Sequence, residues 1–311
     1  MLILKTRAVA LKSVAFSPSG RHLATGDSRG YLSCWDLETR ELSWEHRFGT
    51  SALSLVFFGP AGKVLGFNNG ILLCIDLATG TTEPTPQLST RYNHWPLWLA
   101  VSPAPTARLA VVYARSTAVT GYRFPDLEHT WTRKLPEASL LRSAQIGSLH
   151  REVTAPSTLA YDVTGTRLLV GTLTGNAYLL DALTGKLLQR LTDRPDSAIK
   201  EVALSRDARY GAISAGSTLW LYELQPTVRE VAVHRLGRKH FSALAFHPVT
   251  GRLASASGEG IVDWWDPTGG ERRESYDWGR GKITALCFDA RGDRAAACTT
   301  NGEVIVWDVD S

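Results

Sequence analysis

The chain has 311 residues, of which 44% are hydrophobic and 21% charged, and its net charge is +4. These values are ordinary for a folded globular protein and argue against a disordered chain. The sequence contains no run of 18 apolar residues, which excludes a membrane-spanning helix.

The chain begins with a β-like segment, Leu2 to Val9, that precedes any repeated unit. Only three apolar residues stand between Met1 and Lys5, and no small-residue cleavage pattern follows an apolar core. We therefore expect a structural segment, not a targeting signal, and an intracellular, cytoplasmic protein. The four cysteines form no C-x-x-C pair and no histidine completes a zinc site, so we expect them to be small buried hydrophobic residues.

The repeated unit is clearest in residues 241–266, FSALAFHPVTGRLASASGEGIVDWWD. Three short β-rich runs are separated by turns at His247–Gly251 and Gly258–Gly260, where Gly and Pro supply the turn geometry. This order of strands and turns predicts a meander of antiparallel strands.

The unit recurs along the whole chain. Its third run ends in an apolar and an acidic residue at Trp35-Asp36, Ile75-Asp76, Leu180-Asp181, Tyr222-Glu223, Trp265-Asp266 and Trp307-Asp308, with Tyr122-Arg123 as the irregular member. The spacings are 40, 47, 58, 42, 43 and 42 residues. A basic residue follows the turn before the second run of every unit: Arg21, Lys63, Arg108, Arg167, Arg209, Arg252 and Arg294. Two features that keep in phase seven times indicate a true repeat.

The sequence resembles the WD40 β-propeller family, most clearly at residues 14–36, 244–266 and 286–308. The resemblance implies seven four-stranded blades around a channel, usually serving as a rigid platform for other molecules. Two family features are missing: the Gly-His pair before the first strand, and the aspartate in the turn before the third strand. Arg29, Thr174, Glu259 and Asn301 occupy that aspartate position. We therefore expect the family's buried Asp-His-Ser/Thr-Trp network to be absent from most blades.

The predicted fold is all-β, a single seven-bladed propeller domain. The expected blades are residues 11–46, 52–83, 97–133, 156–190, 199–235, 241–278 and 283–311, with 2–9 added to the last. Only three residues follow Asp308, so the last blade lacks a fourth strand, and residues 2–9 are predicted to supply it. Residues 134–156 form an insertion between the third and fourth blades, and we expect it either to bind a partner or to pack on the rim.

Ion pairs are predicted across the hairpin of every blade except the third, because the start of the second strand lies beside the end of the third strand. Blade three is the exception, since Arg108 and Arg123 occupy the two positions there. The expected pairs are Arg21 with Asp36, Lys63 with Asp76, Arg167 with Asp181, Arg209 with Glu223, Arg252 with Asp266 and Arg294 with Asp308. The carboxylates offset most of the positive charge. A structural ring is therefore favoured over the alternative, an anion-binding ring.

Partner binding is expected on the opposite, loop-rich face, where arginines lie among aromatic residues. The candidate residues are Arg91, Tyr92, His94, Trp95, Arg142, His150, Arg151, Arg238, Lys239 and Arg280. This composition is typical of protein interfaces, although the same residues could contact phosphates or unpaired bases. A solvated rim without function is the third possibility.

The sequence has no H-E-x-x-H motif and no phosphate-binding glycine loop, and it predicts no catalytic residue, cofactor or metal site. The predicted function is a non-enzymatic scaffold that binds a protein or peptide, as a monomer away from the membrane. The alternative is binding of nucleic acid or another anionic ligand, and the third is a propeller hydrolase.

Overall fold

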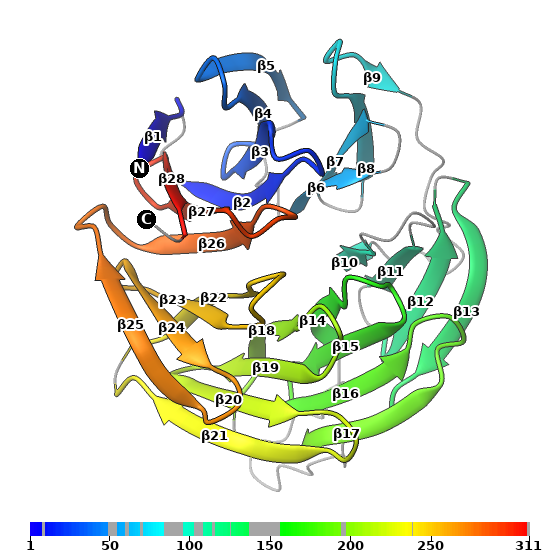
Figure 1. The fold of residues 1–311 in the computed structure, drawn as a ribbon. Helices are drawn as coiled ribbons and strands as arrows, with labels where there is room; N and C mark the ends of the chain where they lie inside the picture. The colour runs from blue at the N-terminus through cyan, green and yellow to red at the C-terminus, as the bar shows by residue number, and fades with distance from the viewer. Residues whose placement is uncertain are drawn as a thin grey trace, which may run out of the picture.

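The computed structural model describes residues 1–7, 10–48, 55–59, 62–68, 71–83, 96–102, 108–113, 116–124, 126–136, 156–193, 197–237 and 239–309. These ranges contain β-strands and no α-helix, and hence no helix that could cross a membrane. The strands form seven four-stranded antiparallel sheets arranged in a ring (Figure 1). The prediction of an all-β, seven-bladed propeller is confirmed. The insertion predicted at 134–156 lies outside the described residues from 137 to 155.

Blades 1 to 3 take their strands in chain order. Blade 1 is β2 (Leu11–Phe16), β3 (His22–Asp27), β4 (Tyr31–Asp36) and β5 (Glu41–Arg47). Blade 2 is β6 (Leu55–Gly59), β7 (Lys63–Asn68), β8 (Ile71–Asp76) and β9 (Thr82–Glu83). Blade 3 is β10 (Pro96–Val101), β11 (Arg108–Tyr113), β12 (Ala118–Arg123) and β13 (Glu128–Lys134).

Blades 4 to 6 repeat this order. Blade 4 is β14 (Pro156–Tyr161), β15 (Arg167–Thr172), β16 (Asn176–Asp181) and β17 (Leu187–Asp193). Blade 5 is β18 (Ile199–Leu204), β19 (Tyr210–Ala215), β20 (Thr218–Glu223) and β21 (Arg229–Arg235). Blade 6 is β22 (Phe241–Phe246), β23 (Leu253–Ser257), β24 (Ile261–Asp266) and β25 (Glu271–Asp277).

Blade 7 joins both ends of the chain. It consists of β26 (Ile283–Phe288), β27 (Arg294–Thr299), β28 (Glu303–Asp308) and β1 (Leu2–Lys5). β1 runs antiparallel to β28, with Leu2 opposite Val306 and Lys5 opposite Glu303, and the two strands lie side by side in Figure 1. The prediction that the N-terminal strand completes the last blade is confirmed.

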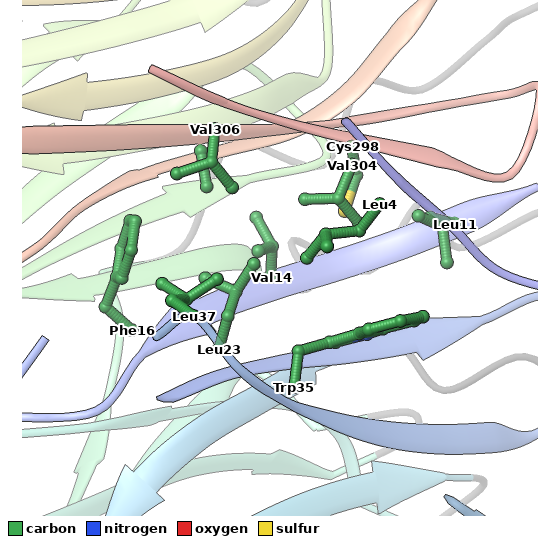
Figure 2. Packing of buried hydrophobic residues seen from close by; sticks show 11 residues of the cluster. Leu4, Leu11, Val14, Phe16, Leu23, Trp35, Leu37, Cys298, Val304 and Val306 are labelled. Carbon is green, nitrogen blue, oxygen red and sulfur yellow. The ribbon is translucent and has the colours of Figure 1, made fainter. Parts of the chain in front are cut away.

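The hydrophobic core lies between neighbouring blades. The middle strands are buried almost without interruption, as in β3 and β15, because each of their faces is covered by another blade. At the seam of blades 7 and 1, Leu4 and Val304 pack in one cluster with Leu23 and Trp35 (Figure 2). The outermost strand β25 is exposed along its whole length.

Neighbouring blades are also joined by hydrogen bonds at their turns. The buried ring of His247 contacts Gly292 of the next blade, where Nε2 lies 2.9 Å from the carbonyl oxygen. Arg294 then donates to the carbonyl of Gly20 in blade 1, at 2.6 Å. Farther out, the indole of Trp131 in blade 3 donates to the carbonyl of Ala182 in blade 4, at 3.0 Å. These contacts fix the blades relative to one another.

Blade 6 contains a buried serine–tryptophan hydrogen bond of the kind that the resemblance to WD40 repeats leads one to expect. The indole N–H of Trp265 donates to Ser255 Oγ at 2.8 Å, and the ring of His234 lies 4.2 Å from that of Trp265. In blade 1 a buried aspartate from the end of β3 organises the turn instead: Asp27 Oδ1 accepts from the N–H groups of Arg29 and Tyr31, both at 2.8 Å. An aspartate at the end of the second strand thus caps the turn that follows it.

Candidate functional site

The ring has two faces that differ in construction. The connection face consists of the links between blades and the turns between second and third strands, such as 258–260 and 278–282. The turn face consists of the turns between first and second strands and between third and fourth strands, such as 247–252 and 267–270.

The sequence predicts the partner-binding residues on the connection face, and most of them lie outside the described residues. Those outside are Arg91, Tyr92, His94, Trp95, Arg142, His150, Arg151 and Arg238. Lys239 and Arg280 are described, so the structure locates two of the ten, and the predicted aromatic pair, Tyr92 and Trp95, is outside the described residues.

Lys239 and Arg280 form ion pairs with acidic residues of the same face. The ammonium group of Lys239 is paired closely with the carboxylate of Glu259. Arg280 Nη1 lies 3.8 Å from Glu303 Oε1, and Lys5 Nζ lies 3.7 Å from the same oxygen. This part of the connection face therefore presents mixed charge, which suits a polar protein surface better than a row of phosphates.

Four of the predicted hairpin ion pairs are present on the turn face. The distances are 2.8 Å for Arg21–Asp36, 3.1 Å for Lys63–Asp76, 3.4 Å for Arg167–Asp181 and 3.1 Å for Arg209–Glu223. The backbone N–H of Thr79 and then the ammonium of Lys63 lower the pKa of Asp76 to about 2. Asp36, Asp76 and Asp181 also accept hydrogen bonds from the backbone N–H groups of their own turns. Glu223 pairs in addition with Arg229 at 2.7 Å, so all four carboxylates are structural.

The predicted pair of Arg252 with Asp266 is wrong. Arg252 donates to Glu274 on the outer strand at 2.6 Å and lies over the ring of Trp264, 5.0 Å from its centroid. Asp266 accepts instead from Arg273 at 3.0 Å and from the N–H of Thr268 at 2.9 Å. The cause is the acidic and basic residues of β25, which offer each group a nearer partner on the exposed side of the blade.

Arg294 lies opposite Asp308 in the ladder, as the hairpin geometry requires. Its guanidinium donates to the carbonyl of Gly20 at 2.6 Å, and Arg294 Nε lies 4.0 Å from Asp289 Oδ2. This arginine therefore also joins blade 7 to blade 1, a role that the hairpin rule does not predict.

A groove of about 890 Å³ lies on the turn face between blades 5 and 6. Its walls are the turn 205–210 of blade 5, the turn 248–252 of blade 6, residues 266–268, and Arg273 and Glu274 of β25. We call it the blade 5–6 groove. It carries four arginines, Arg206, Arg209, Arg252 and Arg273, and three acids, Asp207, Asp266 and Glu274.

The acids of the groove are occupied by bonds within the chain. Asp207 Oδ1 accepts from Ser205 Oγ at 2.7 Å and from the N–H of Arg209 at 3.0 Å. Glu274 accepts from Tyr276 and then from Arg252, and both bonds lower its pKa. Arg206 is exposed and makes no ion pair within the part of the chain that the structure describes. The groove is therefore positively biased toward a ligand.

Exposed apolar side chains gather on the same face. Val249 in the groove is 66% exposed, and Leu183 and Val163 of blade 4 are 46% and 39% exposed. The sequence analysis did not predict a binding surface on the turn face. A usable signal was present, because Pro248 and Val249 stand in a turn where the β-meander needs no apolar residue.

No group of three or more His, Cys, Asp or Glu side chains within the described ranges lies close enough to hold a metal ion. The cysteines that the sequence predicted to be buried are free thiols; Cys34, Cys74 and Cys298 are buried and Cys287 is partly so. Burial raises the pKa of the Cys34 thiol to about 12, which makes it a poor nucleophile at neutral pH.

Three comparisons place the chain among known proteins. The family model described as "WD domain, G-beta repeat" matches residues 5–36 and 274–308. The crystal structure of the β-propeller domain of Cps50 (Swd1) from Myceliophteria thermophila superposes with a TM-score of 0.76, covering 98% of each chain at 16% identity. A search of curated protein sequences finds no significant match. At this identity the structural likeness supports the fold alone.

Proposed function

We propose that this chain, a WD40-repeat β-propeller, is a non-enzymatic platform that binds a protein or peptide partner. Neighbouring blades are joined by hydrogen bonds at their turns, so side chains of the turn face are held in place before a partner arrives. A preorganised surface loses little conformational entropy on binding, which favours affinity without movement of the platform.

The observation that carries this proposal is the blade 5–6 groove. It combines an exposed valine, two prolines and four arginines, and arginines near apolar contacts are enriched where interfaces concentrate their binding energy. Arg252 and Arg273 are each held by a carboxylate, so their remaining N–H donors point in fixed directions.

The occupant that fits this groove is an extended segment rich in acidic side chains. The groove's own acids are saturated by internal donors, while Arg206 is exposed on its wall. Carboxylates of a partner would therefore meet guanidinium groups without displacing an internal pair, and the carbon chain of the segment would cover Val249.

The connection face is proposed as a second contact surface for the same partner. Lys239 and Arg280 represent it among the described residues, and their pairing with Glu259 and Glu303 gives that surface both signs of charge. Mixed charge of this kind contributes to orientation and association rate more than to affinity.

The test is affinity capture from native lysate with four proteins, followed by binding measurements on the partner that is identified. Arg206→Glu with Val249→Ser alters the groove, and Lys239→Ala with Arg280→Ala alters the connection face. Arg291→Glu is the matched control, because it reverses an exposed arginine in the corresponding turn of blade 7. We expect the groove variant to lose at least about tenfold in affinity, or about 1.4 kcal/mol, and the control to bind normally.

Two results would reject the proposal. One is recovery of the same partner at unchanged affinity by both altered proteins. The other is recovery of nucleic acid alone, released steeply by salt, because binding that depends on phosphate contacts weakens with counterion concentration.

A further inference from the structure

A second cavity lies in the central channel, at the end that opens on the connection face. Its volume is about 220 Å³, below the range of sites that enclose drug-sized ligands, so it suits a single chemical group or a small ion. The first strands of the blades surround the channel in Figure 1, and residues from six of them line this cavity. We call it the channel-mouth cavity.

A recurring β-bulge directs side chains into this cavity. In six of the first strands the ladder skips the second residue: Lys12, Leu97, Ser157, Lys200, Ser242 and Thr284. A bulge bends the strand and re-aims the side chain of the skipped residue. Lys12, Lys200, Ser242 and Thr284 line the cavity.

Two hydroxyl groups in the cavity have no partner in the described chain. Ser13 Oγ and Ser242 Oγ are buried without a hydrogen bond, and the Ser13 residue is only 6% exposed. Thr284 differs, because its hydroxyl donates to the carbonyl of Cys298 at 3.2 Å. Buried hydroxyls almost always have a hydrogen-bond partner, so these two are available to bond to water or to a ligand that enters the cavity.

The charge of the cavity is positive at neutral pH. Lys12 and Lys200 are exposed at the mouth and make no ion pair with any residue that the structure describes. Glu201 is the single carboxyl among the described lining residues, and burial raises its pKa to about 8, so most of it is uncharged at pH 7.

We propose that the channel-mouth cavity binds an oxyanion, with Lys12 and Lys200 supplying the positive charge and the hydroxyls of Ser13 and Ser242 donating hydrogen bonds. The oxyanion is either a free small anion or a carboxylate carried by a bound peptide. Binding of a cationic group is disfavoured, because the ammonium groups of Lys12 and Lys200 at the mouth of the cavity would repel it. The site is separate from the blade 5–6 groove, which lies on the other face.

Glu201 makes the proposed site sensitive to pH. The groups that surround the cavity beside it are Thr158 and Leu159 on β14, Ser242, Ala243 and Leu244 on β22, and the ammonium groups of Lys12 and Lys200. While protonated, the Glu201 carboxyl donates a hydrogen bond to the anion. Once ionised, it repels the anion, so affinity falls as pH rises through about 8.

The experiment is calorimetric titration with inorganic phosphate at about pH 7, and with succinate at about pH 7 and about pH 9, which lie on either side of the pKa of Glu201. Both carboxylates of succinate are ionised at the two pH values, so a change in its affinity reports on the protein. We expect saturable binding that weakens by about tenfold at the higher pH and by at least about tenfold in Lys12→Gln with Lys200→Gln. Glu201→Gln should still bind and should lose the pH dependence. Lys186→Gln, an exposed lysine of the turn face, controls for net charge.

A glutamate-containing peptide and its glutamine counterpart distinguish the two sources of the oxyanion. Stronger binding of the glutamate peptide than of succinate identifies a peptide carboxylate, whereas stronger binding of the free anions identifies a small-molecule site. The proposal is overturned if no anion binds saturably, if Lys186→Gln weakens binding as much as the paired lysine variant, or if affinity rises with pH.

Discussion

His247 shows how one side chain joins two blades. Its Nδ1 accepts from the N–H groups of Val249 and Thr250 at 3.1 and 3.0 Å, so Nε2 carries the proton that it donates to Gly292. The imidazole therefore closes its own turn and ties it to the next one. From the sequence His247 was interpreted only as the first residue of a turn, because the partner lies 45 residues away.

The seam at His247 can be tested with two glycine substitutions. A Cβ at Gly292 would lie 2.3 Å from His247 Cε1, whereas a Cβ at Gly251 would meet nothing within 4 Å, and both have positive φ, +81° and +70°. We expect Gly251→Ala to cost about 1 kcal/mol of unfolding free energy from backbone strain, and Gly292→Ala about 3 kcal/mol. Urea unfolding measures both. Equal costs would show that the contact with His247 contributes nothing.

Glu201 predicts a pH dependence of stability. Its pKa is about 8 in the folded chain and about 4.3 in an unfolded one, so between these values the folded state holds a proton that the unfolded state has released. Stability from this group is therefore highest below pH 4 and falls as pH rises toward 8. Because water reaches the channel mouth, we expect a loss of about 1–3 kcal/mol.

Glu201→Gln should remove that loss. The free energy of unfolding of the Glu201→Gln protein, measured by urea titration from about pH 5 to about pH 9, should decline less than that of the native chain. Glu41→Gln, which alters an exposed carboxyl of β5, is the control and should follow the native curve. A parallel decline in all three proteins would contradict a strongly desolvated Glu201.

Strands were the most predictable elements of this protein. The alternation of apolar residues and the regular Gly and Pro turns define the meander locally, and the 42–43 residue rhythm repeats it. Ring closure by β1 was predictable as well, because β28 would otherwise have an open edge. The predicted ion pair between Arg252 and Asp266 does not form, because Glu274 and Arg273 of β25 pair with these two residues instead. The sequence does not specify the directions of the β25 side chains.

Removal of residues 1–9 should destabilise the whole ring. The deletion removes the four-residue pairing of β1 with β28 and uncovers the cluster around Leu4 and Trp35. We expect the melting temperature to fall by about 10 °C or more, since several kcal/mol are lost. Leu4→Ala should reproduce part of the fall, and Lys5→Ala, with an exposed side chain, almost none. A chain lacking residues 1–9 that melts like the native protein would disprove the closure.

At the scale of the whole molecule, the binding surface was harder to predict than the fold. The blade 5–6 groove joins two turns that are more than 40 residues apart, and only the curvature of the ring decides how far they separate. The sequence indicated where turns occur, but not which pair of turns leaves a groove or whether Val249 is covered. The ten residues predicted on the connection face remain a prediction, with Lys239 and Arg280 placed in ion pairs.

The channel-mouth cavity, like the blade 5–6 groove, is formed by residues that are far apart in the sequence. Lys12 and Lys200 are distant in sequence and reach one cavity because each is the skipped residue of a bulge in equivalent strands. Periodicity alone predicts which residues alternate across a strand, but a bulge shifts that alternation by one residue. For this reason the lysines could be assigned to strands from the sequence and not to a common site.

The most direct measurement is site-specific photo-cross-linking in native lysate. A photoreactive residue replaces either Val249, 66% exposed in the blade 5–6 groove, or Leu173, 52% exposed in a turn of the connection face. Our account predicts a protein adduct at position 249 that disappears in the Arg206→Glu background. An adduct at position 173 alone, or no protein adduct at either position, would contradict a platform that binds its partner through the groove.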